Sequence, residues 1–373
     1  MKILQLGKFY PIKGGVEKVM YDLMEGLSSR GIRCDMLCAS AEIKIKEKIN
    51  INENAFLYVE PTLKELAKTK ISPALIRKLR QIQHEYDIIH IHHPDPMAAL
   101  ALFSSNYKGK VILHWHSDIL SQKIILKAYA WLQTWLIKRA DLILGTTPLY
   151  IAESPYLKKV QTKIDYLPIG IKDESNEINL DIYTKISTKY SNKKIIFSLG
   201  RLVEYKGFEY LIKAAKYLDE SFVILIGGTG GLKEKLSELI KKNSLDKKVE
   251  LLGYLSSEEV LAFFKLCDIY CLSSIMKTEA FAIVQIEAMS FGKPIVSVNI
   301  PGSGVQWVNA DNITGINVEI KNPEEIATAI KNIFKSTETY HLYSINARKR
   351  YEHNFTLELM TDKALSFYKK VLD

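Results

Sequence analysis

The fold class is indicated most clearly by Lys194-Ile-Ile-Phe-Ser-Leu-Gly-Arg-Leu-Val-Glu-Tyr-Lys-Gly207. It begins with a short, mostly apolar run that predicts a buried strand, and Gly200 then opens a polar loop. A helix-like segment follows from Phe208. Strands that pass through glycine loops into helices are the repeating unit of a parallel sheet covered by helices. The stretch therefore predicts an α/β fold, whose ligands bind at the carboxyl ends of the strands.

The same alternation continues on both sides of this stretch. The polar, weakly periodic residues 172–192 follow an expected domain boundary, and 373 residues suffice for two domains. We expect residues 1–168 to form an amino-terminal Rossmann-like domain and 169–352 a carboxy-terminal one, with a helix of about 353–373 packing back on the first. The expected strands are 2–6, 33–39, 87–92, 110–116, 142–146, 163–168, 194–200, 222–226, 249–252, 269–272, 294–298 and 315–318.

Composition excludes several classes of protein. Hydrophobic residues make up 47% of the chain and charged residues 25%, which is the balance of a globular protein. The amino-terminal run does not resemble a signal peptide, and no run of ~18 uncharged apolar residues is present. The four cysteines stand in apolar runs, as Cys34/Cys38 and Cys267/Cys271, which favours buried, reduced thiols over a zinc site. The sequence therefore predicts a cytoplasmic protein.

The net charge of +9 is concentrated in the first half, where residues 1–168 hold 24 Lys and Arg against 16 Asp and Glu. The segment 123–139 combines aromatic and basic residues, including Trp131 and Trp135. A solvated face and a helix packed on its sheet explain these features simply, but they also suit peripheral contact with an anionic membrane. Nucleic acid is not an expected partner, because no recognised motif accompanies the charge. A second basic segment in the first half, 64–80, allows the same two explanations. Its basic residues are Lys64, Lys68, Lys70, Arg77, Lys78 and Arg80.

Glycines mark three loops that follow expected strands: Gly14-Gly15, the loop from Gly200 to Gly207, and 227–231. Glycines at the start of a helix let backbone amides and the helix dipole approach an anion. In the second loop, Arg201 and Lys206 can together neutralise a diphosphate. Each feature alone also fits a structural turn or a solvated charge, and none matches a dinucleotide fingerprint or a phosphate loop.

The segment 273–296 carries two carboxylates, Glu279 and Glu287, ahead of a Gly-Lys-Pro break. Eight positions on a helix rise ~12 Å. A glycosidase pair needs carboxyl groups ~5 Å or ~6.5–9.5 Å apart, so two-acid hydrolysis is disfavoured. The two carboxylates could instead hold two ends of an extended ligand.

Taken in chain order, the Gly14-Gly15 loop, the strand end His116-Ser-Asp118, the segment from Gly200 to Gly207, and the pair Glu279 and Glu287 resemble the retaining family 4 glycosyltransferases of the GT-B fold. The resemblance covers nearly the whole chain. It implies two Rossmann-like, doubly wound parallel-sheet domains facing across a cleft, with a sugar-nucleotide donor held mostly by the second domain. The acceptor would enter from the first domain, and neither a metal nor a cofactor is expected.

The resemblance also assigns roles to single residues. Arg201 and Lys206 would hold the diphosphate, Glu279 the hydroxyls of the donor sugar, and Glu287 the ribose hydroxyls. His116 would contact the sugar near its reacting carbon, although His114 shares the same strand face and either histidine could be structural. Further donor contacts would come from Gly14, Gly15, Gly230, Ala280, Phe281 and Ala282.

Three departures from the family pattern are visible. The family often has Gly where Ala282 stands, and a bulkier residue there could narrow the donor-sugar site. Its hinge usually reads Pro-Asn-Gly, whereas this chain has Pro168-Ile169-Gly170. The glycine loop 227–231 lacks an acidic residue that is often present. None of these changes removes a charged group from the expected donor site.

The expected function is transfer of a hexose, with retention, to a hydroxyl of a glycan or lipid-linked acceptor in bacterial surface-polysaccharide synthesis, at the inner face of the cytoplasmic membrane. The histidine segments 90–94 and 114–119 look most like bacterial polysaccharide mannosyltransferases, which favours GDP-mannose as the donor. A UDP-hexose-dependent transferase, a GT-B-shaped epimerase or phosphorylase, and a non-enzymatic sugar-nucleotide binder are the alternatives. Retention follows from the resemblance, since the sequence shows no clear nucleophile.

Overall fold

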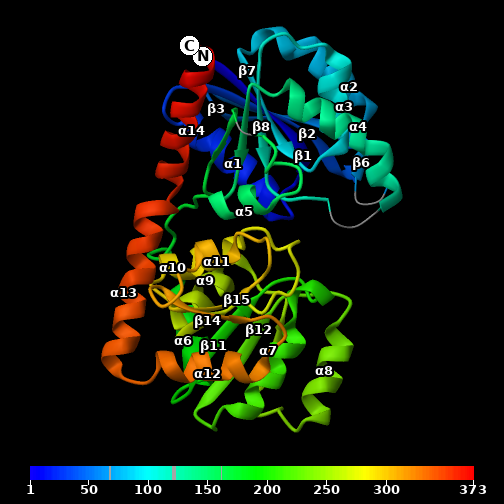
Figure 1. Cartoon of the computed structure of the whole chain (residues 1–373). Helices are drawn as coiled ribbons and strands as arrows, with labels where there is room; N and C mark the ends of the chain where they lie inside the picture. The colour runs from blue at the N-terminus through cyan, green and yellow to red at the C-terminus, as the bar shows by residue number, and fades with distance from the viewer. Residues whose placement is uncertain (67–68, 120–122, 161) are drawn as a thin grey trace. The chain divides into compact units, whose positions relative to one another are not determined.

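A computed structural model describes residues 1–66, 69–119, 123–160 and 162–373, with backbone alone for 123–128. The chain divides into two compact units, residues 1–170 with 357–373, and residues 171–356 (Figure 1). It therefore passes from one unit to the other twice. Both passages adjoin the same place in the second unit, because Ile171 forms a β-bridge with Thr356 and its amide donates to the Phe355 carbonyl at 2.9 Å.

The first unit is built on an eight-stranded sheet in the order β10-β9-β8-β7-β1-β2-β4-β3. All neighbours are parallel except β3 and β4. A separate antiparallel pair joins β5 and β6. The strands are β1 (Lys2–Tyr10), β2 (Arg33–Ile43), β3 (Glu47–Asn52), β4 (Ala55–Thr62), β5 (Lys64–Leu66), β6 (Thr69–Ile71), β7 (Ile88–His93), β8 (Lys110–Trp115), β9 (Leu142–Gly145) and β10 (Ile164–Tyr166).

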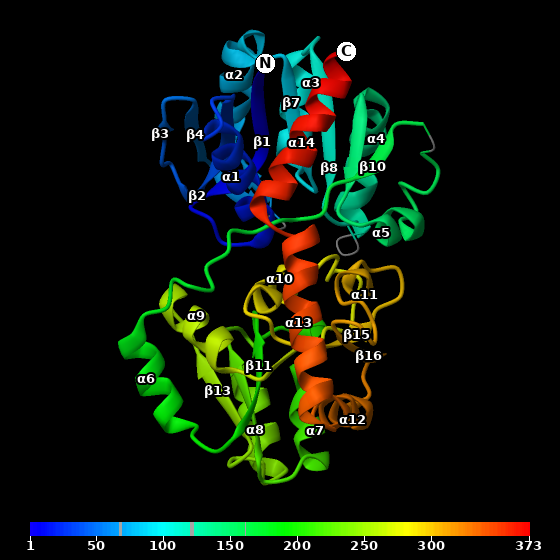
Figure 2. The same ribbon diagram turned by 90° about the vertical axis from the view of Figure 1, so that its left-hand side faces the viewer.

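Helices cover both faces of this sheet, with α1 and α14 on one side and α2 and α3 on the other (Figure 2). Gly26 lets α1 and α14 approach closely, because a Cβ there would lie 2.5 Å from the Thr361 hydroxyl. Asp95 begins α3 by accepting hydrogen bonds from the amides of Met97 and Ala98. The helices are α1 (Gly15–Ser28), α2 (Pro73–Ile82), the 3₁₀ turn Gln83–Glu85, α3 (Pro96–Ser105), α4 (Lys123–Arg139), α5 (Pro148–Glu153) and α14 (Leu357–Leu372).

The second unit is built on a fully parallel six-stranded sheet in the order β13-β12-β11-β14-β15-β16. The strands are β11 (Lys194–Leu199), β12 (Phe222–Gly227), β13 (Val249–Gly253), β14 (Ile269–Cys271), β15 (Ile295–Asn299) and β16 (Gly315–Glu319). The helices are α6 (Leu180–Lys189), α7 (Phe208–Ala214), α8 (Lys233–Lys242), α9 (Ser257–Leu266), α10 (Ile283–Ser290), α11 (Val305–Val308), α12 (Pro323–Ile333) and α13 (Thr337–Asn354), with 3₁₀ turns at Glu204–Lys206 and Ala215–Tyr217.

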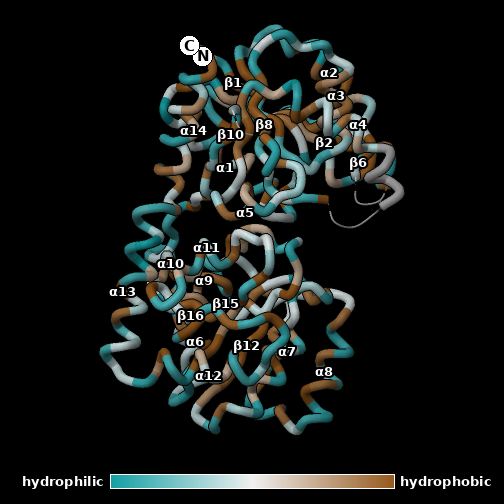
Figure 3. Tube along the Cα trace, in the orientation of Figure 1, coloured by the Kyte–Doolittle hydropathy of each residue, from teal (hydrophilic) through white to brown (hydrophobic). Residues whose placement is uncertain are grey.

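The α/β architecture with two Rossmann-like sheets is confirmed, and every strand expected from the sequence is present. Hydrophobic segments run through the sheets and through the helices that cover them (Figure 3). One strand departs from the parallel pattern: β3 pairs antiparallel with β4 through a tight connection at Asn52, whose side chain accepts from the Asn54 amide. None of the helices formed by the described residues has the length and apolar character needed to cross a membrane.

Candidate functional site

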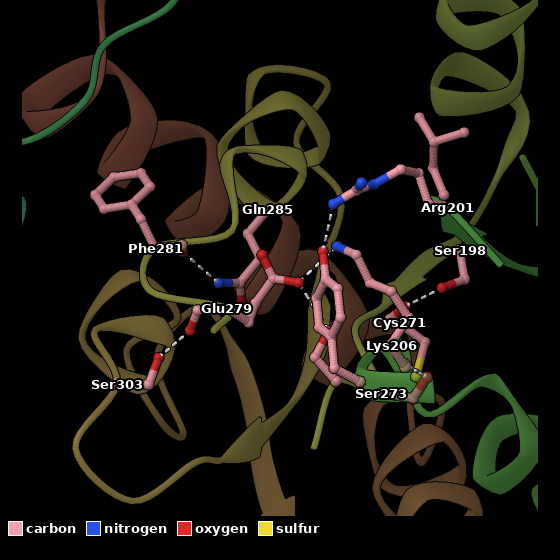
Figure 4. Close-up of polar contacts among 12 residues, drawn as sticks. Ser198, Arg201, Lys206, Cys271, Ser273, Glu279, Phe281, Gln285 and Ser303 are labelled. Atoms are coloured by element: carbon pink, nitrogen blue, oxygen red, sulfur yellow. Dashed lines mark hydrogen bonds and ion pairs between the residues drawn. The ribbon is translucent and has the colours of Figure 1, made fainter. Parts of the chain in front are cut away.

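An ion pair between Lys206 and Glu279 joins two loops that follow neighbouring strands of the second unit (Figure 4). Lys206 ends the 3₁₀ turn after β11, and Glu279 lies between β14 and α10. The Nζ–Oε2 distance is 2.5 Å, and the two side chains are only 11% and 12% exposed. The Ser274 hydroxyl donates to the same carboxylate oxygen at 2.9 Å. The site thus contains two charges held against each other at the edge of the sheet.

Two glycines allow Lys206 to lie where it does. Gly207 has a φ of +63°, and a Cβ there would lie 2.1 Å from the Ser273 carbonyl oxygen. Across the loop, a Cβ at Gly200 would lie 3.1 Å from Cε of Lys206. The Ser273 hydroxyl also donates to the Lys206 carbonyl at 2.9 Å. The glycines seen in the sequence therefore serve to place the lysine beside the loop after β14.

The charge on Lys206 is stabilised by its surroundings. Burial alone would lower the pKa of its ammonium group. Attraction by Glu279, with a smaller contribution from Tyr205, outweighs burial, so the pKa of Lys206 lies above its ordinary value. Because the pair is largely buried, removal of either partner would leave an uncompensated charge.

Arg201 carries a second positive charge on the same loop. Its side chain is exposed, and its Nη2 atom donates to the Tyr205 hydroxyl at 3.3 Å. Within the described part of the chain, no carboxylate forms an ion pair with Arg201. Repulsion from Arg201 acts to lower the pKa of Lys206, which shows that the two cations are close enough to interact. An exposed guanidinium without an acidic partner is suited to a phosphate.

The glycine loop 227–231 lies directly against the Arg201 loop. The Leu202 amide donates to the Thr229 carbonyl at 2.8 Å. A Cβ at Gly228 would lie 2.0 Å from the Gly200 carbonyl oxygen, and one at Gly230 would lie 2.5 Å from that of Leu202. These glycines permit a close backbone approach, so Gly230 supports the loop that carries Arg201.

The segment from Ala280 to Ala282 is buried and leads into α10. Ala282 has a φ of +64°, a left-handed conformation that favours glycine, which gives a physical reason for the glycine common in the resembling family. The Ala280 carbonyl accepts from the Gly304 amide at 2.9 Å, and the Ser303 hydroxyl donates to the carbonyl of Glu279. Phe281 is buried between the two alanines.

Glu287 lies half-buried on α10. Glu279 precedes α10, which begins at Ile283, so a helical rise does not measure its separation from Glu287. The negative charges of Glu279 and Glu287 both affect the pKa of Tyr270. Burial raises the pKa of this tyrosine most, and Glu279 and Glu287 add to the shift. Tyr270 donates to the Leu199 carbonyl at 3.4 Å, which joins it to the strand end before Arg201.

The second unit therefore brings the expected donor residues to one edge of its sheet, and it adds three that the sequence did not single out: Tyr205, Tyr270 and Ser303. Ser274 lies in the expected segment 273–296, but the sequence assigned it no role. Tyr205, Ser274 and Ser303 follow strands at the same edge, and Tyr270 lies within β14. That position is the signal that could have identified them.

The remaining expected residues belong to the first unit. Gly14 and Gly15 are exposed at the start of α1, and a Cβ at Gly14 would lie 2.7 Å from a carboxylate oxygen of Glu17. Burial raises the pKa of Glu17, while Lys8 and the backbone amides of Glu17 and Gly14 lower it. Glu17 therefore faces the amides expected to meet an anion, a role that its sequence position did not indicate.

His116 directly follows β8 and is buried beside His92 and His114. Nitrogen atoms of His90, His92 and His114 lie within 4.8 Å of one another, the arrangement among the described residues that could hold a metal. The rings of His90 and His92 are stacked, however, with centroids 4.6 Å apart and planes 17° apart. A metal lies in the plane of each imidazole that binds it, so nearly parallel, stacked rings do not meet at one ion.

The four cysteine thiols are buried, and Cys271 ends β14 beside the site (Figure 4). All are buried and free, as expected from the sequence. Burial raises the pKa of the Cys34, Cys267 and Cys271 thiols to about 12. They are therefore protonated and unreactive at neutral pH.

Comparison with known proteins covers almost the entire chain. Residues 13–174 match the family model described as Glycosyltransferase Family 4, and residues 181–350 match Glycosyl transferases group 1. The O-antigen chain mannosyltransferase C of Escherichia coli is 28% identical over 100% of this chain and 99% of its own length. The D-rhamnosyltransferase WbpZ of Pseudomonas aeruginosa is 26% identical over 95% of this chain and 92% of its own length.

Solved structures with the same fold also extend over the full length. The Anabaena protein HepE in complex with UDP superposes with a TM-score of 0.78 at 18% identity, covering 99% of this chain and 100% of its own. The sucrose-phosphate synthase of Thermosynechococcus elongatus gives a TM-score of 0.79 at 17% identity, covering 100% and 99%. At these identities the likeness concerns the fold.

Proposed function

Since the chain belongs to the family 4 glycosyltransferases of the GT-B fold, we propose that it transfers mannose from GDP-mannose to a hydroxyl of a glycan or lipid-linked acceptor. The acceptor would belong to a bacterial surface polysaccharide. The single observation that carries the donor site is the cluster of Arg201, Lys206 and Glu279 at one sheet edge of the second unit.

The chemistry of a sugar nucleotide explains this combination of charges. When the bond from the anomeric carbon to the diphosphate breaks, negative charge grows on the diphosphate and positive charge on the sugar. Arg201 and Lys206 can stabilise the first, at ~3–4 kcal/mol for each well-placed donor. Glu279 has a second carboxylate oxygen, Oε1, that can accept from a sugar hydroxyl. On donor binding, Lys206 would contact the diphosphate while keeping its ion pair with Glu279.

We further propose retention of configuration and independence of metal ions. In the transfer step the acceptor oxygen bonds to the anomeric carbon on the face that the diphosphate leaves, and the acceptor proton passes to the leaving diphosphate. Two cationic side chains supply the positive charge that a divalent cation would otherwise provide. Proton NMR of the new glycosidic linkage should show the donor's anomeric configuration, and excess EDTA should leave the rate unchanged. An inverted linkage or loss of activity with EDTA would refute these points.

The donor is tested by product identity. A mannosyl group is favoured by the full-length similarity to a mannosyltransferase. A UDP-hexose is the alternative, because HepE was solved with UDP-glucose. Incubation of the protein with each sugar nucleotide and membrane glycolipid should release GDP together with a mannosylated lipid. Release of UDP would favour the alternative donor; an epimerised donor or a sugar phosphate would reject the transferase.

The first unit contributes residues whose roles remain proposals. We propose that His116 contacts the sugar being transferred, and that the Gly14-Gly15 backbone contacts the donor. The nearby Glu17 would oppose an anion when ionised, and its raised pKa reduces that opposition. A Glu17→Gln variant should therefore bind the donor at least as well as the wild type, and a weakened affinity would argue against the Gly14-Gly15 contact.

An aromatic patch on the first unit supports peripheral membrane contact. The patch consists of Leu100 and Phe103 of α3 with Trp131 and Trp135 of α4. The Phe103 ring meets those of Trp131 and Trp135 edge to face, at 5.2 and 5.0 Å between centroids. Trp131 is 53% exposed and Phe103 is 43% exposed. Exposed aromatic rings of this kind suit the headgroup region of a bilayer.

Only part of the expected basic surface is available to support this contact. Arg139 donates to the carbonyls of Tyr107 and Gly109, and Lys70 pairs with Glu65 at 2.6 Å. Lys78 lies over the Tyr58 ring, and Arg80 donates to the Ser104 carbonyl. Lys68 lies outside the described residues. Among the described side chains of these segments, Lys64, Arg77 and Lys138 are exposed and form no ion pair.

Liposome co-sedimentation tests this contact. Vesicles rich in phosphatidylglycerol should bind the wild type at low salt, and a Phe103→Ser/Trp131→Ser variant should bind several-fold less. Tyr217→Ser is the matched control, because this aromatic side chain is 47% exposed on the second unit. Failure of the wild type to sediment at low salt, or equal binding by both variants, would reject the proposal.

A further inference from the structure

A chain of buried polar contacts runs from the carboxy-terminal helix to His116 within the first unit. Gln5 of β1 lies at its centre, and its Nε2 atom donates to the Tyr368 hydroxyl at 3.2 Å. That hydroxyl lies 2.6 Å from Nδ1 of His90. On the other side, Gln5 Oε1 lies 2.8 Å from Nε2 of His92, and His92 Nδ1 lies 2.9 Å from Nε2 of His116. All five side chains are buried.

The Gln5 amide sets the direction of these hydrogen bonds. Its oxygen can only accept, so His92 must carry a proton on Nε2 and donate it. A neutral His92 then accepts at Nδ1, and His116 must donate from its own Nε2. The Gln5 nitrogen likewise donates to Tyr368, whose hydroxyl proton is then directed at His90.

Burial keeps the two histidines neutral, as this assignment requires. It lowers the pKa of His92 and of His116 well below the ordinary value, and neighbouring histidines and Lys8 act in the same direction. His116 is therefore left with an unprotonated Nδ1. Within the described residues this buried atom has no hydrogen-bond partner, so its lone pair is unused in the free protein.

We propose that Gln5 and His92 are positioning residues that hold His116 as the Nε2-protonated tautomer, so that Nδ1 accepts a hydrogen bond from a hydroxyl of the transferred sugar. This inference rests on the proposed role of His116 in transfer. With the opposite tautomer Nδ1 would donate, and the sugar hydroxyl would have to direct its proton elsewhere. In a buried setting an acceptor that lacks its partner is costly, which favours a substrate with a hydroxyl at that position.

The tautomer can be measured on the free protein. The chain has eight histidines, so ¹⁵N-histidine labelling gives a small set of signals in a long-range ¹H–¹⁵N spectrum, and a His116→Asn variant assigns the one of interest. The expected result at neutral pH is a protonated Nε2 and an unprotonated Nδ1 on His116. A proton on Nδ1, or on both nitrogens, overturns the proposal.

Two variants separate positioning from a structural role. Gln5→Met keeps the length of the side chain and removes the amide, so the opposite tautomer of His116 should become populated. The value of kcat should fall about tenfold, the effect of one lost hydrogen bond, with donor KM within about twofold. His114→Phe is the control: it keeps the ring stack against His116, 4.0 Å between centroids, and should leave both the tautomer and kcat unchanged.

An unchanged His116 tautomer and kcat in Gln5→Met would overturn the positioning role. If that variant fails to fold, the wild-type spectrum still decides the tautomer. If the spectra behave as expected but no sugar nucleotide supports transfer, the proposed function fails while the hydrogen-bonded chain stands. The two failures are therefore distinguishable.

Discussion

Lys206 differs most from its expected state, because it is paired with an acidic residue. The sequence suggested a cation waiting for a diphosphate, whereas in the structure its charge already meets Glu279 at 2.5 Å. The ion pair compensates two largely buried charges when no donor is bound. It also places the lysine before the donor arrives, which reduces the ordering needed during the reaction.

Removing either Lys206 or Glu279 alone should destabilise the fold, and removing both should destabilise it less than the two single losses added together. Lys206→Met should lower the free energy of unfolding by about 3 kcal/mol, because Glu279 is left buried and unpaired. The double variant Lys206→Met/Glu279→Gln should lose less than the sum of the single losses, by about 1–3 kcal/mol. Urea unfolding of the wild type, Lys206→Met, Glu279→Gln and the double variant measures this coupling. If the two single losses simply add up in the double variant, the ion pair contributes nothing to stability.

Unlike Lys206, Arg201 should matter for catalysis but not for folding stability. Its side chain is exposed and has a tyrosine hydroxyl as its partner. Arg201→Met should leave unfolding unchanged within about 0.5 kcal/mol. It should reduce kcat by about 10²–10³-fold, the loss of one donor to the developing charge. Steady-state kinetics decide the point; a change confined to acceptor KM would contradict a role at the diphosphate.

At the scale of elements, the loops after β11 and β14 depend on glycine. Gly207→Ala would force a side chain into a left-handed conformation and onto the Ser273 carbonyl. We expect it to destabilise the fold by at least about 1–2 kcal/mol and to reduce activity with it. Gly231→Ala is the matched control, because nothing lies within 4 Å of a Cβ there. Thermal unfolding should separate the two; equal melting temperatures would contradict this role.

The sequence predicted the strands well, because buried parallel strands are short apolar runs bounded by glycine and polar loops. It therefore predicted which loops share one edge. It missed the strands β3, β4, β5 and β6: the Glu-Lys-Ile-Asn-Ile-Asn run of β3 reads as polar, and β5 and β6 are only three residues long.

Contacts between residues distant in the chain could not be predicted in this way. The partnership of Gln5 with Tyr368 joins the first strand to the last helix, and that of Lys206 with Glu279 joins two loops. Both depend on how the elements pack in three dimensions. The family resemblance supplied residue roles but no information on which groups neutralise each other in the free protein.

At the scale of the whole molecule, buried histidines make the two units differ in acid stability. His90, His92, His93, His114 and His116 lie buried in the first unit, whereas His341 and His353 of the second are exposed. Burial lowers the pKa of His93 and His114 to about 3 and that of the others well below the ordinary value. Above pH ~6.5 both folded and unfolded histidines are neutral, so stability is unaffected there.

Below that pH the unfolded chain binds protons that the folded unit excludes, so stability falls as the pH falls from ~6.5 towards ~3. At pH 5.5 each such histidine costs about 1.4 kcal/mol. Calorimetry between pH 7.5 and 5.5 should show the first unit's transition moving down more than the second's. His114→Phe should lose less stability over this range, and a parallel decline of both transitions would contradict the assignment.

Donor-dependent thermal unfolding tests whether the second unit binds a sugar nucleotide through Arg201, Lys206, Glu279 and Glu287. GDP-mannose should raise the melting temperature of the wild type progressively with its concentration, because only the folded state binds it. Glu287→Ala should fold normally and show little or no rise over the same concentrations. A full rise in that variant, or none in the wild type with any GDP- or UDP-sugar, would show that these residues do not bind the donor.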